Sequence, residues 1–130
     1  MNFIINLEVY PFDVMVSIGE TDEAVVKHLV KKGVPLTECN KHLIEINGKG
    51  RSLMFPTGQS LLRLPKKPET NFDMAVLQHE IFHIVQFVMH KVGVTLSDDS
   101  DEAYAYLIQF LTLKIYNKLY LPLFMDYFIS

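Results

Sequence analysis

Two histidines and a glutamate stand at a spacing that suits metal-assisted hydrolysis. His79, Glu80 and His83 form the pattern His-Glu-x-x-His. Residues four apart on a helix lie on one face, one turn above each other, so the two imidazoles can converge on a single ion. Neutral imidazole is a preferred ligand of zinc. Glu80 lies beside that face, where it can accept a proton from a metal-bound water instead of binding the metal.

The residues around this pattern are mostly apolar, and the polar ones keep to one side. His79, His83, Gln86 and His90 fall within ~60° of one another around a helix, in a segment that is otherwise largely apolar. A helix that is apolar nearly all round is expected to be buried, and a buried polar stripe is costly unless its members are paired. We therefore expect a metal site, or a water-lined cleft over one. The alternative is a buried structural helix whose polar groups have ordinary partners.

Two histidines leave a tetrahedral zinc site one protein ligand short. His90 lies too far along the helix to reach the same ion, so it serves either around the site or as a helix-end residue. The strongest acidic candidate for the third ligand is Glu102, separated from His83 by eighteen residues. Two alternatives remain open. Glu102 caps the second long helix, as the run from Asp99 to Glu102 allows, or a neighbouring Asp is the ligand.

The pattern His-Glu-x-x-His, eighteen residues, Glu resembles that of the gluzincins, the zinc metallopeptidases whose third ligand is a glutamate on the following helix. The spacing is similar to that of the aminopeptidase-type members, and thermolysin-type members have one more residue. The resemblance covers residues 73–120, and the short chain looks like a minimal, single-domain relative. The run from Asp101 to Tyr106 also resembles short proteins encoded by bacteriophages and prophages.

The resemblance implies a zinc-dependent, peptidase-like hydrolase with peptide or protein substrates. His79, His83 and Glu102 would hold Zn²⁺. Glu80 would be the general base that takes the proton of the attacking water and later delivers it to the leaving amine.

Family members also carry a Tyr or His that stabilises the oxyanion, and no motif identifies it in this chain. Tyr106, one turn after Glu102 on the same helix face, is the catalytic residue that we favour for this task. Tyr104 and His90 are the other candidates.

A strand beside the site would give a substrate peptide a backbone to pair with. The strand at Gln59–Leu64 runs almost directly into the histidine-bearing helix, and as an edge strand it could bind an extended peptide. Arg63 on this strand either contacts a substrate carboxylate or, in the simpler interpretation, is a surface residue that balances charge.

The order of the elements that must position these residues indicates an α+β fold. We expect an N-terminal antiparallel sheet with one short helix, followed by two long helices. Helices are predicted at residues 22–32, 73–91 and 100–120, the first of them capped by Thr21. Turns are predicted at Asn47–Gly50 and Pro56–Gly58. The predicted strands are residues 2–10, Val14–Ile18, Leu43–Ile46, Ser52–Phe55 and Gln59–Leu64.

The composition excludes several classes of protein. With 130 residues, 49% of them hydrophobic and 21% charged, the chain fits one folded domain, residues 1–130, and excludes a largely disordered one. A net charge of −3 with scattered basic residues argues against a nucleic-acid partner. No apolar run is long enough for a membrane span, so we expect no membrane partner.

Compartment and self-association follow from two smaller features. Cys39 is the only cysteine, which excludes an intrachain disulfide or a cysteine zinc cage and fits a reducing compartment. The N-terminus lacks the features of a signal peptide. We therefore expect a soluble cytoplasmic protein, in a bacterial host cell if the chain is phage-encoded. The aromatic tail, Tyr116–Ile129, is expected to leave the helix at Pro122 and to pack on the core or, if exposed, to self-associate.

Two rival functions remain beside the hydrolase. One is a metal-binding but non-catalytic phage accessory or structural interaction protein, favoured by the small size and the unassigned oxyanion donor. The other is a plain α+β module without metal.

Overall fold

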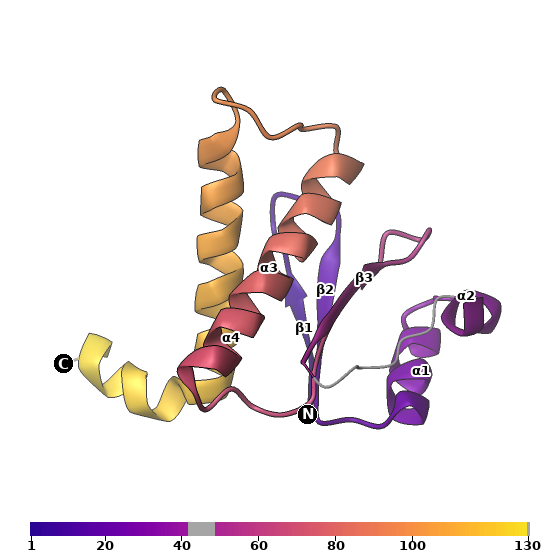
Figure 1. The fold of residues 1–130 in the computed structure, drawn as a ribbon, viewed down its shortest axis with the longest axis horizontal. Coiled ribbons are helices and arrows are strands. Elements are labelled where there is room, and N and C mark those ends of the chain that lie inside the picture. The colour runs from indigo at the N-terminus through magenta and orange to yellow at the C-terminus, as the bar shows by residue number, and fades with distance from the viewer. Residues whose placement is uncertain (42–48, 130) are drawn as a thin grey trace.

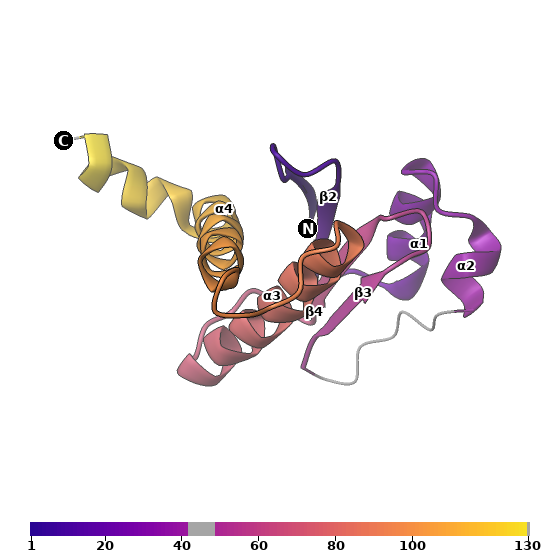
Figure 2. The same ribbon diagram turned by 90° about the horizontal axis from the view of Figure 1, so that it is seen from above.

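A four-stranded sheet lies at the centre of the molecule, with helices against both of its faces (Figures 1 and 2). This computed structural model describes residues 1–41 and 49–129. The predicted α+β class is confirmed. The strands are β1 (Asn2–Asn6), β2 (Asp13–Ile18), β3 (Arg51–Met54) and β4 (Ser60–Leu64). The helices are α1 (Asp22–Lys31), α2 (Leu36–Lys41), α3 (Asn71–Lys91) and α4 (Asp101–Ile129).

The strands are ordered β1-β2-β4-β3 across the sheet. β1 pairs antiparallel with β2, and β3 pairs antiparallel with β4, each through a short connection. β2 and β4 run parallel, with α1 and α2 in the connection between them. The sheet is therefore mixed, whereas the sequence predicted an antiparallel one. A parallel pair needs a long crossover, and the predicted helix at 22–32 lies in that crossover.

Two hydrophobic cores lie on opposite faces of the sheet because the central strands are buried on both sides. Val14, Val16 and Ile18 of β2 pack with α3 and α4, whereas Met15 of the same strand packs with Leu29 of α1. Successive side chains of a strand point to opposite faces, which explains this division.

The helix predictions agree with the structure at most ends. Thr21 caps α1 by accepting a hydrogen bond from the backbone N–H of Ala24 at 3.2 Å. The helix predicted at 73–91 is α3, which begins two residues earlier, and the one predicted at 100–120 is α4. The helix α2 was not predicted. The strand predicted at Leu43–Ile46 and the first part of the turn at Asn47–Gly50 lie outside the described residues.

The C-terminal prediction is corrected in one respect. The backbone of α4 stays helical past Pro122 to Ile129, where the sequence predicted a break. A proline inside a helix can kink it without ending it. The last turns of α4, yellow in Figure 1, accordingly point away from the axis of its orange part. The side chains of 121–129, and with them the predicted packing or self-association of the tail, lie outside the described part of the structure.

A search for membrane spans gave none. Within residues 1–41 and 49–129, no helix combines the length and the apolar character that crossing a membrane requires.

Candidate metal and hydrolytic site

The helix α3 that carries the His-Glu-x-x-His pattern is fixed at its start by a reciprocal cap. Thr70 Oγ1 accepts a hydrogen bond from the backbone N–H of Asp73 at 3.0 Å, and Asp73 Oδ2 accepts one from the backbone N–H of Thr70 at 3.2 Å. The backbone N–H groups of Glu69 and Thr70 both donate to Asp73 Oδ2, and they hold the pKa of the Asp73 carboxyl below its ordinary value because they favour its ionised form. The cap sets where the turns of α3 begin, and thus which residues face the sheet.

The two histidines converge as their spacing predicts. Nε2 of His79 and Nε2 of His83 are 3.0 Å apart, and their ring centroids are 4.7 Å apart with the rings nearly perpendicular. Two nitrogens that bind one tetrahedral zinc at ~2.05 Å lie roughly 3.3 Å apart, so the pair needs little movement to hold an ion. Without a metal, the same geometry is a hydrogen bond between two neutral imidazoles.

The helix face that carries this pair points to solvent. His79, Gln86 and His90 are exposed and His83 is partly exposed, whereas the opposite face of α3 is buried in the core. This corrects the expectation that α3 is buried all round. Because water reaches the polar stripe, its burial cost does not arise, and the argument for a metal rests on the convergence of the two Nε2 atoms.

Glu80 is turned from this exposed face toward the sheet, and its side chain is held there. It is 7% exposed. Ser52 Oγ, on β3, lies 2.7 Å from Glu80 Oε1 and 3.0 Å from the backbone oxygen of Glu80, and its hydroxyl donates to these oxygens. Glu80 Oε2 makes no hydrogen bond to a described residue. One carboxylate oxygen is thus anchored, and the other remains available for a proton.

Gly50 permits the close approach of the chain before β3 to this glutamate. A Cβ atom at Gly50 would lie 3.2 Å from Cγ of Glu80 and 3.2 Å from Cγ1 of Val76. These contacts are tighter than ordinary packing, so a larger residue at this position would require the side chains of Glu80 and Val76 to shift slightly. Gly50, Val76, His79 and Glu80 also line a hollow of about 490 Å³ between α3 and the chain leading to β3. The candidate general base and one candidate ligand therefore share one hollow.

The structure does not bring Glu102 to the histidines. Gln78 Nε2 donates to Thr112 Oγ1 at 3.3 Å, which aligns the antiparallel helices α3 and α4. Glu102 lies ten residues before Thr112 and is therefore level with Val88, about 7.5 Å beyond His83 along the axis of α3. Its side chain is exposed and has no hydrogen bond or ion pair to the described residues, so the capping alternative is not seen either.

The donor set fits zinc in part. The converging imidazoles suit the ion, but no group of three or more His, Cys, Asp or Glu side chains able to hold a metal occurs within residues 1–41 and 49–129.

The three candidates for the oxyanion donor lie apart from the histidine pair. Tyr106 is 65% exposed and lines a different hollow, between α4 and the β1–β2 connection. The hydroxyl of Tyr104 donates to the backbone oxygen of Val94 at 2.6 Å, so it closes the loop between α3 and α4. His90 is exposed near the end of α3, two turns beyond His83.

The substrate strand and its arginine were assigned wrongly. β4 is flanked by β2 and β3, so it is not an edge strand, and the edge next to the site is β3. Arg63 is 2% exposed and donates to Asp22 Oδ1 at 2.6 Å and to the backbone oxygen of Glu20 at 2.7 Å. It joins β4 to the start of α1 on the face of the sheet away from α3.

Sequence reasoning missed Ser52 and Gly50, the residues that position Glu80. A serine on a strand and a glycine in a turn carry no chemical signal of their own. The glycine-rich stretch at Asn47–Gly50 did mark a place where the backbone needs room, but only the packing of β3 against α3 shows that the room is for Glu80.

The comparisons with known proteins add no identity to this geometry. No protein-family model matches the chain, and neither curated proteins nor solved structures gave a match.

Proposed function

We propose that this protein is a zinc-dependent, metallopeptidase-like hydrolase that cleaves peptide bonds. The observation that carries the proposal is the 3.0 Å approach of Nε2 of His79 to Nε2 of His83, with Glu80 anchored by Ser52 and lining the same hollow as His79. Two converging imidazoles next to a half-anchored carboxylate are what metal-assisted hydrolysis needs from a protein.

His79 and His83 would hold the metal. Glu102 is proposed as the third ligand on its sequence spacing alone, because the structure does not bring its exposed side chain to the pair. When bound, zinc supplies a water of lowered pKa and polarises a carbonyl. Glu80 Oε2 takes the proton of the attacking water while Ser52 keeps Oε1 in place. The same oxygen then delivers the proton to the leaving amine.

The edge of β3 supports a peptide as the substrate. In the described part of the chain, β3 pairs with β4 only, so the backbone groups along its outer edge have no strand partner among the described residues. An extended peptide can add to such an edge through main-chain hydrogen bonds, which hold it whatever its side chains are. Ser52 in this strand touches Glu80, so a peptide on β3 would pass next to the proposed base.

The test is the substitution Glu80→Gln, which keeps the shape of the side chain but removes its basicity. We expect the variant to bind zinc as the wild type does and to lose peptide hydrolysis. Turnover of a peptide library should also stop in the wild type when a chelator is added. Unchanged, chelator-resistant turnover in Glu80→Gln would contradict the proposal.

The second candidate is a metal-binding but non-catalytic protein, such as a phage accessory or structural component. Two observations favour it. Tyr106 lines a different hollow, and no third His, Cys, Asp or Glu side chain within residues 1–41 and 49–129 joins the histidine pair in a group able to hold a metal. The substitution Glu102→Ala addresses the ligand directly. If the hydrolase proposal holds, we expect this variant to lose tight zinc binding. Zinc binding at wild-type affinity would show that Glu102 is not a ligand.

A further inference from the structure

We propose that the hollow beyond the histidine pair, between the ends of α3 and β3, is a subsite for a large apolar side chain that stands next to an acidic residue in a peptide. This inference rests on the proposed function, because it names the substrate of the same site. The hollow has a volume of about 530 Å³, within the usual range of ligand pockets. We call it the α3–β3 subsite and define it by Met54, Pro56, Phe87, His90 and Lys91.

The α3–β3 subsite lies next to the proposed site on both of its walls. Phe87 follows His83 by one helical turn, and the two rings stack with centroids 6.3 Å apart. Met54 follows Ser52 by two residues on β3, so both side chains point to the same face. An extended peptide advances roughly 6.6 Å over two residues. A substrate side chain in the subsite would therefore lie about two residues from the peptide bond that is cleaved beside His83.

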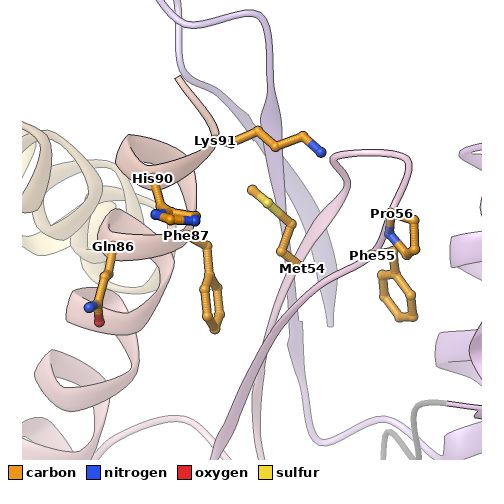
Figure 3. A pocket seen from close by; sticks show the side chains of 7 residues that line it. All are labelled: Met54, Phe55, Pro56, Gln86, Phe87, His90 and Lys91. Carbon is orange, nitrogen blue, oxygen red and sulfur yellow. The ribbon is translucent and has the colours of Figure 1, made fainter. Parts of the chain in front are cut away.

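The walls of the α3–β3 subsite are apolar and adaptable. Figure 3 shows the Met54 side chain and the Phe87 ring on opposite sides of the space, one from the strand and one from the helix. An unbranched thioether adjusts to the shape of its neighbour, and it packs well against aromatic rings. A large aliphatic or aromatic side chain therefore gains most from this space, whereas alanine would leave it filled with water.

The rim of the α3–β3 subsite is basic. Lys91 extends over Met54, and His90 lies on the helix side of the same opening (Figure 3). No acidic side chain lines the subsite, and Lys91 has no ion pair within residues 1–41 and 49–129. A peptide carboxylate beside the apolar residue would meet this unpaired ammonium group at the exposed rim, whereas a lysine there would be repelled. Charge complementarity thus selects an acidic neighbour for the apolar residue.

The experiment uses fluorescein-labelled heptapeptides of Gly and Ala with Phe-Glu, Phe-Lys, Ala-Glu or Ala-Lys at the centre. Binding is measured by fluorescence anisotropy at low salt with the Glu80→Gln variant, so that no peptide is consumed. We expect the Phe peptides to bind at least about tenfold more tightly than the Ala peptides, because an Ala peptide has no aromatic side chain to bury in the subsite. We expect Glu to be preferred to Lys by about threefold, as a solvent-exposed pair allows.

Two further substitutions assign these preferences to the subsite. Lys91→Glu, added to Glu80→Gln, should invert the preference for Glu over Lys. The matched control Lys114→Glu changes a lysine of α4 that lies over the Phe110 ring, away from the subsite, and should leave the preference as it is. Met54→Trp should fill the space and remove the preference for Phe over Ala. Because Met54 is partly exposed on the edge strand, the larger Trp side chain can be accommodated and the variant is expected to fold.

The outcomes separate this inference from the proposed function. No selectivity among the four peptides, or selectivity that Lys91→Glu and Met54→Trp leave unchanged, overturns the subsite. Selective binding that responds to these substitutions supports the subsite even if the wild type hydrolyses none of the peptides, a result that counts against the hydrolase alone. Chelator-sensitive hydrolysis without selectivity overturns the subsite and leaves the hydrolase standing.

Discussion

Two of the polar clusters in the described part of this molecule are built differently. At the start of α1, Glu20 Oε1 accepts hydrogen bonds from Asn2 Nδ2 at 2.8 Å and from Ser17 Oγ at 2.7 Å, and Glu20 Oε2 lies 3.1 Å from His28 Nε2. Arg63 adds its bonds to Asp22 and to the backbone of Glu20. We call this the α1 network. Its members come from β1, β2, β4 and α1, so it joins elements that are distant in sequence.

The cluster on α3 has far fewer partners. His79 and His83 contact each other, and Glu80 has Ser52 as its one side-chain partner in the described residues. The α1 network shares its hydrogen bonds among side chains from several elements, as structural polar groups usually do. In the α3 cluster, the imidazoles of His79 and His83 reach solvent, and one oxygen of the buried Glu80 has no hydrogen-bond partner among the described residues. The comparison shows that the first cluster joins distant elements of the fold, whereas the second has few protein partners in the described residues, as our proposal of a ligand site requires.

The largest expected effect is the loss of the α1 network. Arg63→Met should lower the free energy of unfolding by about 2 kcal/mol, because it leaves the backbone oxygen of Glu20 without its guanidinium donor and removes the hydrogen bond to Asp22. Urea unfolding measures this loss. Arg51→Met, in the register position opposite Arg63 but partly exposed, is the matched control and should change the free energy by less than about 1 kcal/mol. Equal losses in the two variants would erase the distinction between the clusters.

An intermediate effect is expected at the partner of Glu80. Ser52→Ala should lower kcat for peptide hydrolysis by about tenfold, because outer hydrogen-bond partners of a metal site usually matter on this scale. Zinc affinity and unfolding free energy should change little, since Ser52 is partly exposed. Ser52→Thr keeps the hydroxyl and should restore most of the rate. If Thr and Ala variants are equally slow, the hydroxyl does not position Glu80.

The smallest effect is the acid sensitivity of the α1 network. Burial raises the pKa of Glu20, but the hydrogen bonds from Ser17 and Asn2 and the charges of His28 and the amino terminus outweigh it, so the pKa lies below its ordinary value. A lowered pKa stabilises the fold above the ordinary Glu value, and this contribution is lost as the pH falls through the folded-state pKa. The stability difference between wild type and Glu20→Gln should therefore be full at neutral pH and shrink on acidification below pH ~4. A difference that is the same at neutral and acid pH would contradict this.

The comparison also shows how far the sequence could predict the molecule. The convergence of His79 and His83 followed from the helical period, and the α1 and α3 helices from apolar spacing and capping residues. These are local features, which depend on a few consecutive residues. The sequence predicted that the polar residues of α3 share one face of the helix. It did not predict that this face is exposed to solvent, because exposure depends on which other elements cover the helix.

What could not be predicted depends on contacts between distant segments. Arg63 looked like a surface residue because its partners Glu20 and Asp22 lie forty residues earlier, across a parallel strand pair. The position of Glu102 relative to His83 depends on how far α4 is shifted along α3, and the loop between them does not fix that shift. The hydrogen bond between Ser52 and Glu80 depends on the packing of β3 against α3, which no local sequence pattern predicts.

The most direct test of the central claim is the zinc content of the purified protein. Wild type, His83→Ala and the matched control His90→Ala would be loaded with zinc, dialysed against zinc-free buffer and analysed by inductively coupled plasma mass spectrometry. We predict about one zinc per chain in wild type and in His90→Ala, and almost none in His83→Ala. Wild-type protein that holds no more zinc than His83→Ala would contradict the claim that the histidine pair is a metal site.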